Sequence, residues 1–287
     1  MKRSFALIGA ATFGAAMLAA TVNPAQAGFT VFEVNAVLLG GIQPTVDNYR
    51  TALGALNANS PGSVGSGRRE INWDGVPAAS SDPNLFAGNF FNANVAGRAR
   101  GVEFTTPGTG FLVSAAGGGA TPVRFGFPTD FVPFSEQKLF SPIGSVITDV
   151  RFFVPGSSTA ATVSGFGAVF NDVEIAGSSL QAFDENGVSL FSRQILLNQT
   201  SGSLSFLGIL ANAGERISRV RLVSGDMVLL SNGTFAPGTD AVVFDDFIYG
   251  EPVATSAVPV PASLLLLSCG MLSMLWSGWS RGRTNRA

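Results

Sequence analysis

Histidine is absent from this chain of 287 residues, and cysteine occurs once, at Cys269. Without histidine, no Ser-His-Asp or Cys-His nucleophile can form, no histidine can bind a metal, and the usual general base near neutral pH is missing. A single cysteine also excludes a disulfide within the chain. Charged residues make up only 13% of the sequence. The catalytic chemistry that stays open is that of paired carboxylates.

The last thirty residues combine a short motif, an apolar run and a basic end. The motif Val258-Pro-Val-Pro-Ala262 leads into the apolar run Ala262 to Trp279, and three arginines follow at positions 281, 283 and 286. As a helix rising about 1.5 Å per residue, this run of 18 residues spans roughly 27 Å, close to the ~30 Å hydrocarbon core of a bilayer. The arginines would stay in the cytoplasm, so the body of the protein lies outside.

This arrangement resembles the PEP-CTERM sorting signal of Gram-negative bacteria, with Val258, Pro259, Val260, Pro261 and Ala262 as its motif. Val260 stands where most members have Glu, so the resemblance is to the Val-Pro-x-Pro-Ala variant. The resemblance implies that an exosortase-type transpeptidase recognises and removes the tail, and that the protein is anchored in the membrane only until then. An ordinary C-terminal anchor is the alternative.

The N-terminus has the layout of a Sec signal peptide. Met1-Lys-Arg3 is basic, residues 5–20 are apolar, and Ala25-Gln-Ala27 offers a cleavage site before Gly28. We therefore expect export through the inner membrane, followed by a place on the cell surface or in the extracellular matrix. The predicted organisation is a signal peptide (residues 1–27), a β-domain (28–251), a linker (252–257) and the sorting segment (258–287).

The body between the two ends is acidic. Five of the 17 Lys and Arg lie in the ends, whereas all 19 Asp and Glu lie between them, so the body carries 12 basic and 19 acidic residues, a net charge of −7. Nucleic acids and anionic membrane surfaces attract clustered Lys and Arg. We therefore expect no nucleic-acid partner, and membrane contact only through the C-terminal helix.

Most of the body has the pattern of short β-strands. One helix is predicted at about residues 44–56, because Val46, Tyr49, Leu53 and Leu56 recur at helical spacing after Pro44. Strand signals then recur between Gly-, Pro-, Asn- and Asp-rich turns, and Asp184-Glu-Asn-Gly187 is typical of a hairpin. We predict an all-β fold, a jelly-roll or β-sandwich of two antiparallel sheets with one short N-terminal helix, plus the C-terminal sorting helix.

The body also resembles a group of secreted bacterial proteins that often end in PEP-CTERM tails. The resemblance extends over nearly all of residues 28–251, and the association of the group with lectin-like jelly rolls is an analogy that supplies no function. The stretches that carry it are Arg68 to Pro77, Phe104 to Phe111, Ile147 to Gly156, Gly165 to Asp172 and Val243 to Gly250.

Two adjacent carboxylates in the last predicted strand, Asp245 and Asp246, are the candidate metal ligands. Strand alternation puts Asp245 on one face with Phe247 and Tyr249, and Asp246 on the other with Phe244, so burial of either face takes a carboxylate with it. A buried carboxylate needs a partner. One interpretation is a structural Ca²⁺ bound by either aspartate, with further oxygens from Glu70, Asn72 or Asp74. The alternative pairs these acids with Arg68, Arg69 or Arg219.

Two functional classes follow, together with one alternative that has no ligand. The first is an exported, non-catalytic protein of the exopolysaccharide matrix, with the sandwich as a carbohydrate or matrix binding module. The second is a secreted carbohydrate-active enzyme that uses two of Glu103, Glu136, Glu174 and Glu215, which nothing pairs in sequence. The third is a structural coat protein. Trp73 could serve as a sugar platform, but it shares a strand face with Ile71, which favours the core.

Overall fold

The computed structural model of this chain describes residues 28–115, 125, 131–229 and 236–255. The predicted signal peptide and the predicted sorting segment lie outside these residues. Within the described part, no helix is both long and apolar enough to cross a membrane.

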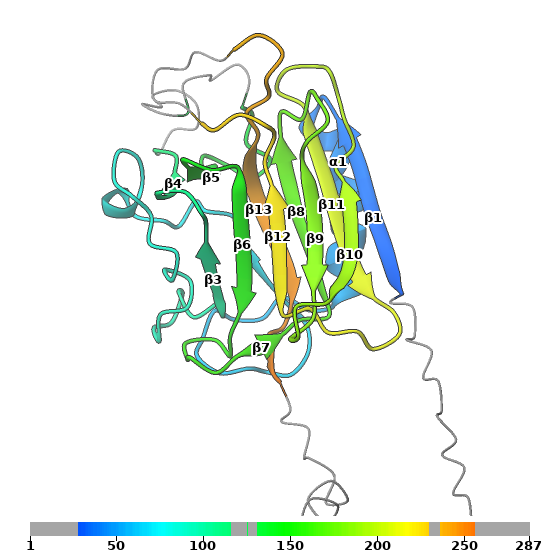
Figure 1. Cartoon of the computed structure of the whole chain (residues 1–287). Coiled ribbons are helices and arrows are strands. Elements are labelled where there is room, and N and C mark those ends of the chain that lie inside the picture. The colour runs from blue at the N-terminus through cyan, green and yellow to red at the C-terminus, as the bar shows by residue number, and fades with distance from the viewer. Residues whose placement is uncertain (1–27, 116–124, 126–130, 230–235, 256–287) are drawn as a thin grey trace, which may run out of the picture.

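The described chain forms two antiparallel sheets that pack face to face (Figure 1). The prediction of an all-β sandwich with a single α-helix is confirmed for these residues. The larger sheet has the order β1-β11-β8-β13-β5-β4, with β2 also paired to β13. Its strands are β1 (Phe29–Ala36), β2 (Arg68–Ile71), β4 (Gly110–Val113), β5 (Phe140–Ile143), β8 (Gly165–Asn171), β11 (Leu204–Ala211) and β13 (Val243–Gly250).

The smaller sheet has five strands in the order β10-β9-β12-β6-β3. These are β3 (Val102–Thr105), β6 (Ile147–Phe152), β9 (Ser179–Phe183), β10 (Ser189–Gln194) and β12 (Arg219–Val223). A two-stranded sheet pairs β7 (Ala161–Thr162) with β14 (Val253–Ala254), so the segment expected as a linker contains a short strand. A short 3₁₀ turn spans Ala78–Ser80.

The main core lies between the two sheets and is rich in phenylalanine. Side chains of alternating positions fill it, for example Val150 and Phe152 from β6 and Phe166 and Phe170 from β8. Trp73 is part of this core, fully buried and stacked on Phe140 with ring centroids 4.1 Å apart. The core interpretation of Trp73 is therefore correct, and the ring is not available to a sugar.

Helix α1 (Leu39–Leu53) covers the outer face of the larger sheet. It begins earlier and ends earlier than predicted, with Pro44 inside it, because the buried positions are Ile42, Val46, Tyr49 and Leu53 and not Leu56. These four positions recur at the helical spacing of three and four residues. Gly54, with φ of 99°, ends the helix, and Leu56 beyond it is exposed.

Two glycines let the helix approach the sheet. Gly167 of β8 and Gly208 of β11 are direct partners, and the ring of Tyr49 lies over them. A Cβ on Gly167 would lie 2.8 Å from Tyr49 Cε1. Crowding by the rings of Tyr49 and Phe206 therefore explains these glycines.

The opposite side of the sandwich is open. No helix or strand of the described part lies over the outer face of the five-stranded sheet, which faces the viewer in Figure 1. Helix α1 lies behind the larger sheet. The described ends of the chain, Gly28 and Thr255, both lie at the lower end of the sandwich in this view.

Candidate functional site

The two adjacent aspartates of β13 lie in a β-bulge. Pairing with β8 shifts register between Phe244 and Phe247, so one extra residue of β13 is accommodated at Asp245 and Asp246. The bulge interrupts the simple alternation of faces. The expected separation of Phe244 from Phe247 and Tyr249 is therefore wrong, because all three side chains enter the core between the sheets.

Asp245 is fully buried and held by backbone and hydroxyl donors. Its carboxylate accepts hydrogen bonds from the Phe134 amide at 2.5 Å and from the Ser135 hydroxyl at 2.9 Å, while its main-chain carbonyl accepts one from Trp73 Nε1 at 2.9 Å. Burial raises the pKa of Asp245 well above its ordinary value, and the neighbouring charge of Asp246 raises it further. Burial therefore disfavours the charged form of this carboxyl group, and the two hydrogen bonds act in the opposite direction.

Asp246 and Glu70 share an arginine from the helix. Arg50 Nη2 lies 2.9 Å from Asp246 Oδ2 and 3.0 Å from Glu70 Oε2, and Arg68 Nε lies 2.6 Å from Glu70 Oε1. Of the arginines expected as alternative partners, Arg68 does bind Glu70. The partner of Asp246 is Arg50, which the sequence pattern did not indicate because the contact depends on how α1 packs on the sheet.

Asn72 and Asp74 bind each other and the chain before β5. Asn72 Nδ2 donates to Asp74 Oδ2 at 2.9 Å, and the Lys138 amide donates to Asp74 Oδ1 at 3.2 Å. Burial raises the pKa of Asp74 to about 6, with the charges of Asp246 and Glu136 adding to it. The five predicted ligands thus lie around one part of the larger sheet, where other groups of the protein already satisfy many of their oxygens. Binding of Ca²⁺ there stays a prediction.

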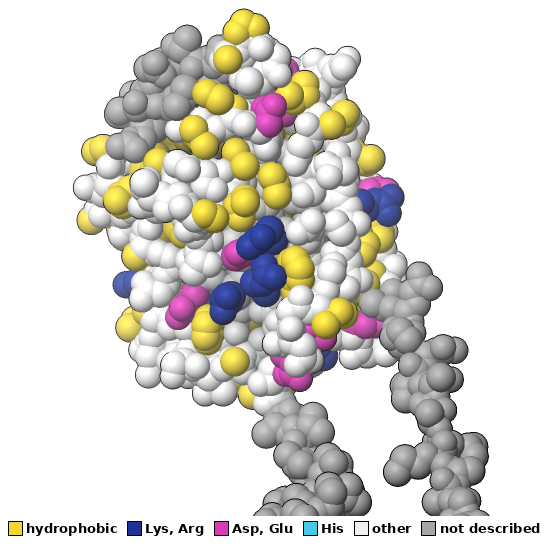
Figure 2. Space-filling view, in the orientation of Figure 1, with side chains coloured by type: hydrophobic (Ala, Val, Ile, Leu, Met, Phe, Trp, Pro, Cys, Tyr) yellow, Lys and Arg dark blue, Asp and Glu magenta, His cyan; other side chains and the backbone are white. Residues whose placement is uncertain are grey.

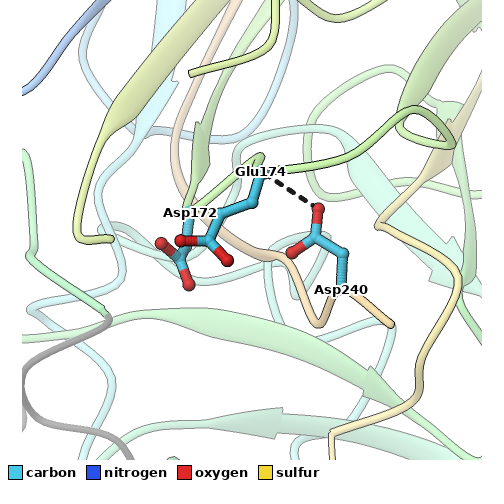
Figure 3. A group of neighbouring side chains, drawn as sticks. All are labelled: Asp172, Glu174 and Asp240. Carbon is cyan, nitrogen blue, oxygen red and sulfur yellow. Dashed lines mark hydrogen bonds between the residues drawn. The ribbon is translucent and has the colours of Figure 1, made fainter. Parts of the chain in front are cut away.

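A different group of carboxylates lies closer together, as Figure 3 shows. Asp172, Glu174 and Asp240 each offer an oxygen, and these oxygens lie within 4.8 Å of one another. Asp172 and Glu174 follow β8, whereas Asp240 precedes β13. In the described part of the chain, this is the one group of three or more acids that meets this distance. The sequence pattern indicated Glu174 but not Asp172 or Asp240. Asp240 lies 66 positions from Glu174, and only the fold brings the two together.

The chain holds the carboxylate of Asp240 in place with two amides. Asp240 Oδ2 accepts hydrogen bonds from the Glu174 amide at 3.0 Å and the Ile175 amide at 3.2 Å. Burial raises the pKa of Asp240 to about 6, and the charges of Glu174 and Asp226 contribute to this rise. Two other glutamates that the sequence offered as catalytic acids are not part of this group. Glu103 is on β3, and the Glu215 carboxylate accepts a hydrogen bond from the Gly28 amide.

The open face of the five-stranded sheet carries arginines. Figure 2 shows Lys and Arg side chains gathered near the middle of this face. Arg219 and Arg221 of β12 both bind Asp149 of β6, at 2.8 and 2.7 Å. Although burial alone would raise the pKa of Asp149, hydrogen bonds from Arg221 and Arg219 lower it below its ordinary value. Arg151, next to them on β6, is exposed.

Two neighbouring clefts share the hairpin turn between β9 and β10. One, of about 400 Å³, is lined by Arg151, Arg219, Ser218 and the turn at residues 184–187. The other, of about 610 Å³, shares most of that turn and includes Arg216. Both volumes fall in the roughly 300–1,000 Å³ range of ligand sites.

The turn that the clefts share is the predicted hairpin. Asp184 Oδ1 accepts hydrogen bonds from the amides of Asn186 and Val188, at 2.9 and 2.8 Å, and Gly187 has φ of 78°. It joins β9 to β10, as the sequence predicted.

The chain matches no protein-family model and no curated protein.

Proposed function

We propose that this chain is an exported, non-catalytic surface protein whose sandwich binds polysaccharide of the extracellular matrix. The signal layout at the N-terminus and the motif, apolar run and basic end at the C-terminus support export and sorting. The single observation that carries the binding role is the open outer face of the five-stranded sheet, with its arginines and the two clefts beside it. Arginine, serine and asparagine side chains on and beside this face offer hydrogen-bond donors and acceptors to a sugar.

The positions of the two described ends fit this proposal. Gly28 and Thr255 lie at the same end of the sandwich (Figure 1), so the signal peptide and the sorting tail would attach there. A protein attached at this end would keep the open sheet face along its side, with the two clefts near the point of attachment, since Thr255 lines both. An exosortase-type transpeptidase would act on Val258 to Ala262, a few residues beyond Thr255 in the chain.

Sorting is tested by expression of the full chain in a Gram-negative host, with and without its exosortase-type enzyme. We expect the tail to be removed only where the enzyme is present, and Pro259→Ala with Pro261→Ala to keep the tail attached. Ser256 stands just before the motif, so Ser256→Ala is the matched control and should be processed normally. Retention of the tail in both hosts would identify an ordinary anchor.

Binding is tested with a glycan array probed by the full-length chain purified in a mild detergent. We expect retention on at least one bacterial polysaccharide and no release of reducing sugar from it. Failure to bind any glycan on the array would contradict the proposal and favour the coat protein without a ligand.

A carboxylate-dependent hydrolase is the second candidate, and one observation favours it. Glu174 and Asp240 bring their carboxylate oxygens within 4.8 Å, and the raised pKa of Asp240, about 6, suits a proton donor. Release of reducing sugar that Glu174→Gln abolishes, in a variant that melts like the parent, would establish the enzyme in place of the binding module.

The predicted structural Ca²⁺ is tested by thermal unfolding. Support would be a higher melting temperature in millimolar Ca²⁺ than in excess EDTA, with the difference lost in Asp246→Asn and kept in Glu174→Gln. Equal melting temperatures would exclude a stabilising ion at the predicted residues.

A further inference from the structure

Two arginines lie directly opposite each other on the open face. In the register of β6 and β12, Arg151 is the partner of Arg219, while Asp149 is the partner of Arg221. Partners across an antiparallel pair lie on the same face, and like charges in that position are destabilising. The juxtaposition of Arg151 and Arg219 is therefore a cost to the sheet that its own contacts must offset.

The contacts within the sheet offset the repulsion between the arginines only in part. Asp149 binds both Arg219 and Arg221, so one carboxylate serves two guanidinium groups. Arg151 forms no ion pair with any described residue, although Glu103 of β3 is its partner on the other side. Three arginines thus face two carboxylates, which leaves an excess of one positive charge on a body of net charge −7.

Two contacts hold the side chain of Arg219 in one position. Its guanidinium carbon lies 3.8 Å from the centre of the Phe183 ring, and its Nη1 binds Asp149. An arginine fixed in this way loses little conformational freedom when it binds a ligand. Arg151 and Arg219 also line the cleft of about 400 Å³, together with the polar Ser218 and Asn186. Two carboxylates line it as well: Asp184 accepts hydrogen bonds from amides of its own turn, and Glu185 is exposed.

We propose that the cleft between Arg151 and Arg219 binds an acidic polysaccharide, whose carboxylate or sulfate groups are held by the two guanidinium groups. This inference rests on the proposed function and names the class of polysaccharide. The planar guanidinium fork matches a carboxylate or sulfate with two parallel hydrogen bonds, and such bonds are stronger than those between neutral groups. The anion would also relieve the repulsion between the two arginines.

A nucleic acid fits this face poorly. Duplex DNA binds through many neutralised phosphates. The face offers three arginines, of which two already bind Asp149, and the acidic body around it would repel a polymer of high charge density. A polysaccharide whose acidic groups are separated by sugar rings needs fewer cationic side chains to bind.

The test compares immobilised polygalacturonate with its fully methyl-esterified form, which has the same backbone without charge. The full-length chain in mild detergent should bind the acidic polymer, and higher salt should weaken that binding. Arg151→Gln should weaken it at least tenfold, which corresponds to about 1.4 kcal/mol. Because Arg151 is exposed, has no ion pair among the described residues and lies opposite Arg219, this variant should melt at the parental temperature or slightly above it.

Arg193→Gln is the matched control, since Arg193 lies on β10 of the same sheet but pairs with Glu33 at its edge. It should bind polygalacturonate like the parent. Equal binding of the esterified polymer, or full binding by Arg151→Gln, would overturn the arginine site while leaving polysaccharide binding intact. Equal or tighter binding of DNA would overturn the choice of ligand. Failure to bind both polymers and every glycan on the array would overturn the proposed function as well.

Discussion

Arg69 and Glu251 form a buried ion pair with two hydrogen bonds. Arg69 Nε lies 2.7 Å from Glu251 Oε2, and Arg69 Nη2 lies 2.9 Å from Glu251 Oε1, with both side chains about 1% exposed. Arg69 also donates to the carbonyl of Ala99, and Asn57 donates to Glu251. The pair therefore joins β2, the end of β13 and two loops.

Removal of one partner of this pair should be costly. Arg69→Met would leave the Glu251 carboxylate buried without its cation, and we expect a loss of about 3–5 kcal/mol in the free energy of unfolding. Urea unfolding followed by circular dichroism measures it. Arg193→Met, which breaks an exposed pair, should cost less than about 1 kcal/mol. Similar losses in the two variants would contradict the importance of the buried pair.

Trp73 should contribute to the stability of the fold and not to ligand binding. Trp73→Ala would empty the space beside Phe140 and remove the donor to the Asp245 carbonyl, so we expect a loss of about 3–5 kcal/mol in the free energy of unfolding. Trp73→Phe should lose less, since it keeps a ring against Phe140. A Trp73→Ala protein of parental stability that no longer bound polysaccharide would show that the ring faces a ligand.

Gly167→Ala should destabilise the contact between helix and sheet. The added methyl group would lie 2.8 Å from Tyr49 Cε1, and overpacking of this kind costs about 1–3 kcal/mol. Gly40→Ala is the control, because nothing lies within 4 Å of its added Cβ, and it should cost no stability. Chemical denaturation of both variants gives the comparison, and a neutral Gly167→Ala would mean that Tyr49 can move away.

Stability should fall as pH rises from about 4 to about 6. The folded pKa values of Asp74 and Asp240 are raised from 3.8 to about 6, so the folded state holds more protons than the unfolded state across this window. By linkage, the stabilisation is present below the unfolded pKa and is lost as pH rises through the folded one. Asp240→Asn should flatten the slope of the urea midpoint between pH 4 and 6. An unchanged slope would assign the effect to other groups.

Local signals and long-range contacts differ in how far the sequence predicts them. The hairpin at Asp184 to Gly187 was predictable because its turn chemistry lies within a few residues. The bulge at Asp245 and Asp246 was not, since it arises from register against β8, which lies far away along the chain. For the same reason Arg50 was missed as the partner of Asp246, from which 196 positions separate it. The helix bounds were displaced because Pro44 indicated a start that the buried position Ile42 overrides.

The shared end of Gly28 and Thr255 has a consequence for many copies on one surface. Copies attached to one surface at this shared end would stand in parallel, each with its open sheet face on a flank. A long polymer lying between them could then touch several copies at once, and linked weak contacts of this kind gain roughly 10²–10⁴-fold in avidity. A modest affinity at each sandwich would suffice to hold a matrix to the cell.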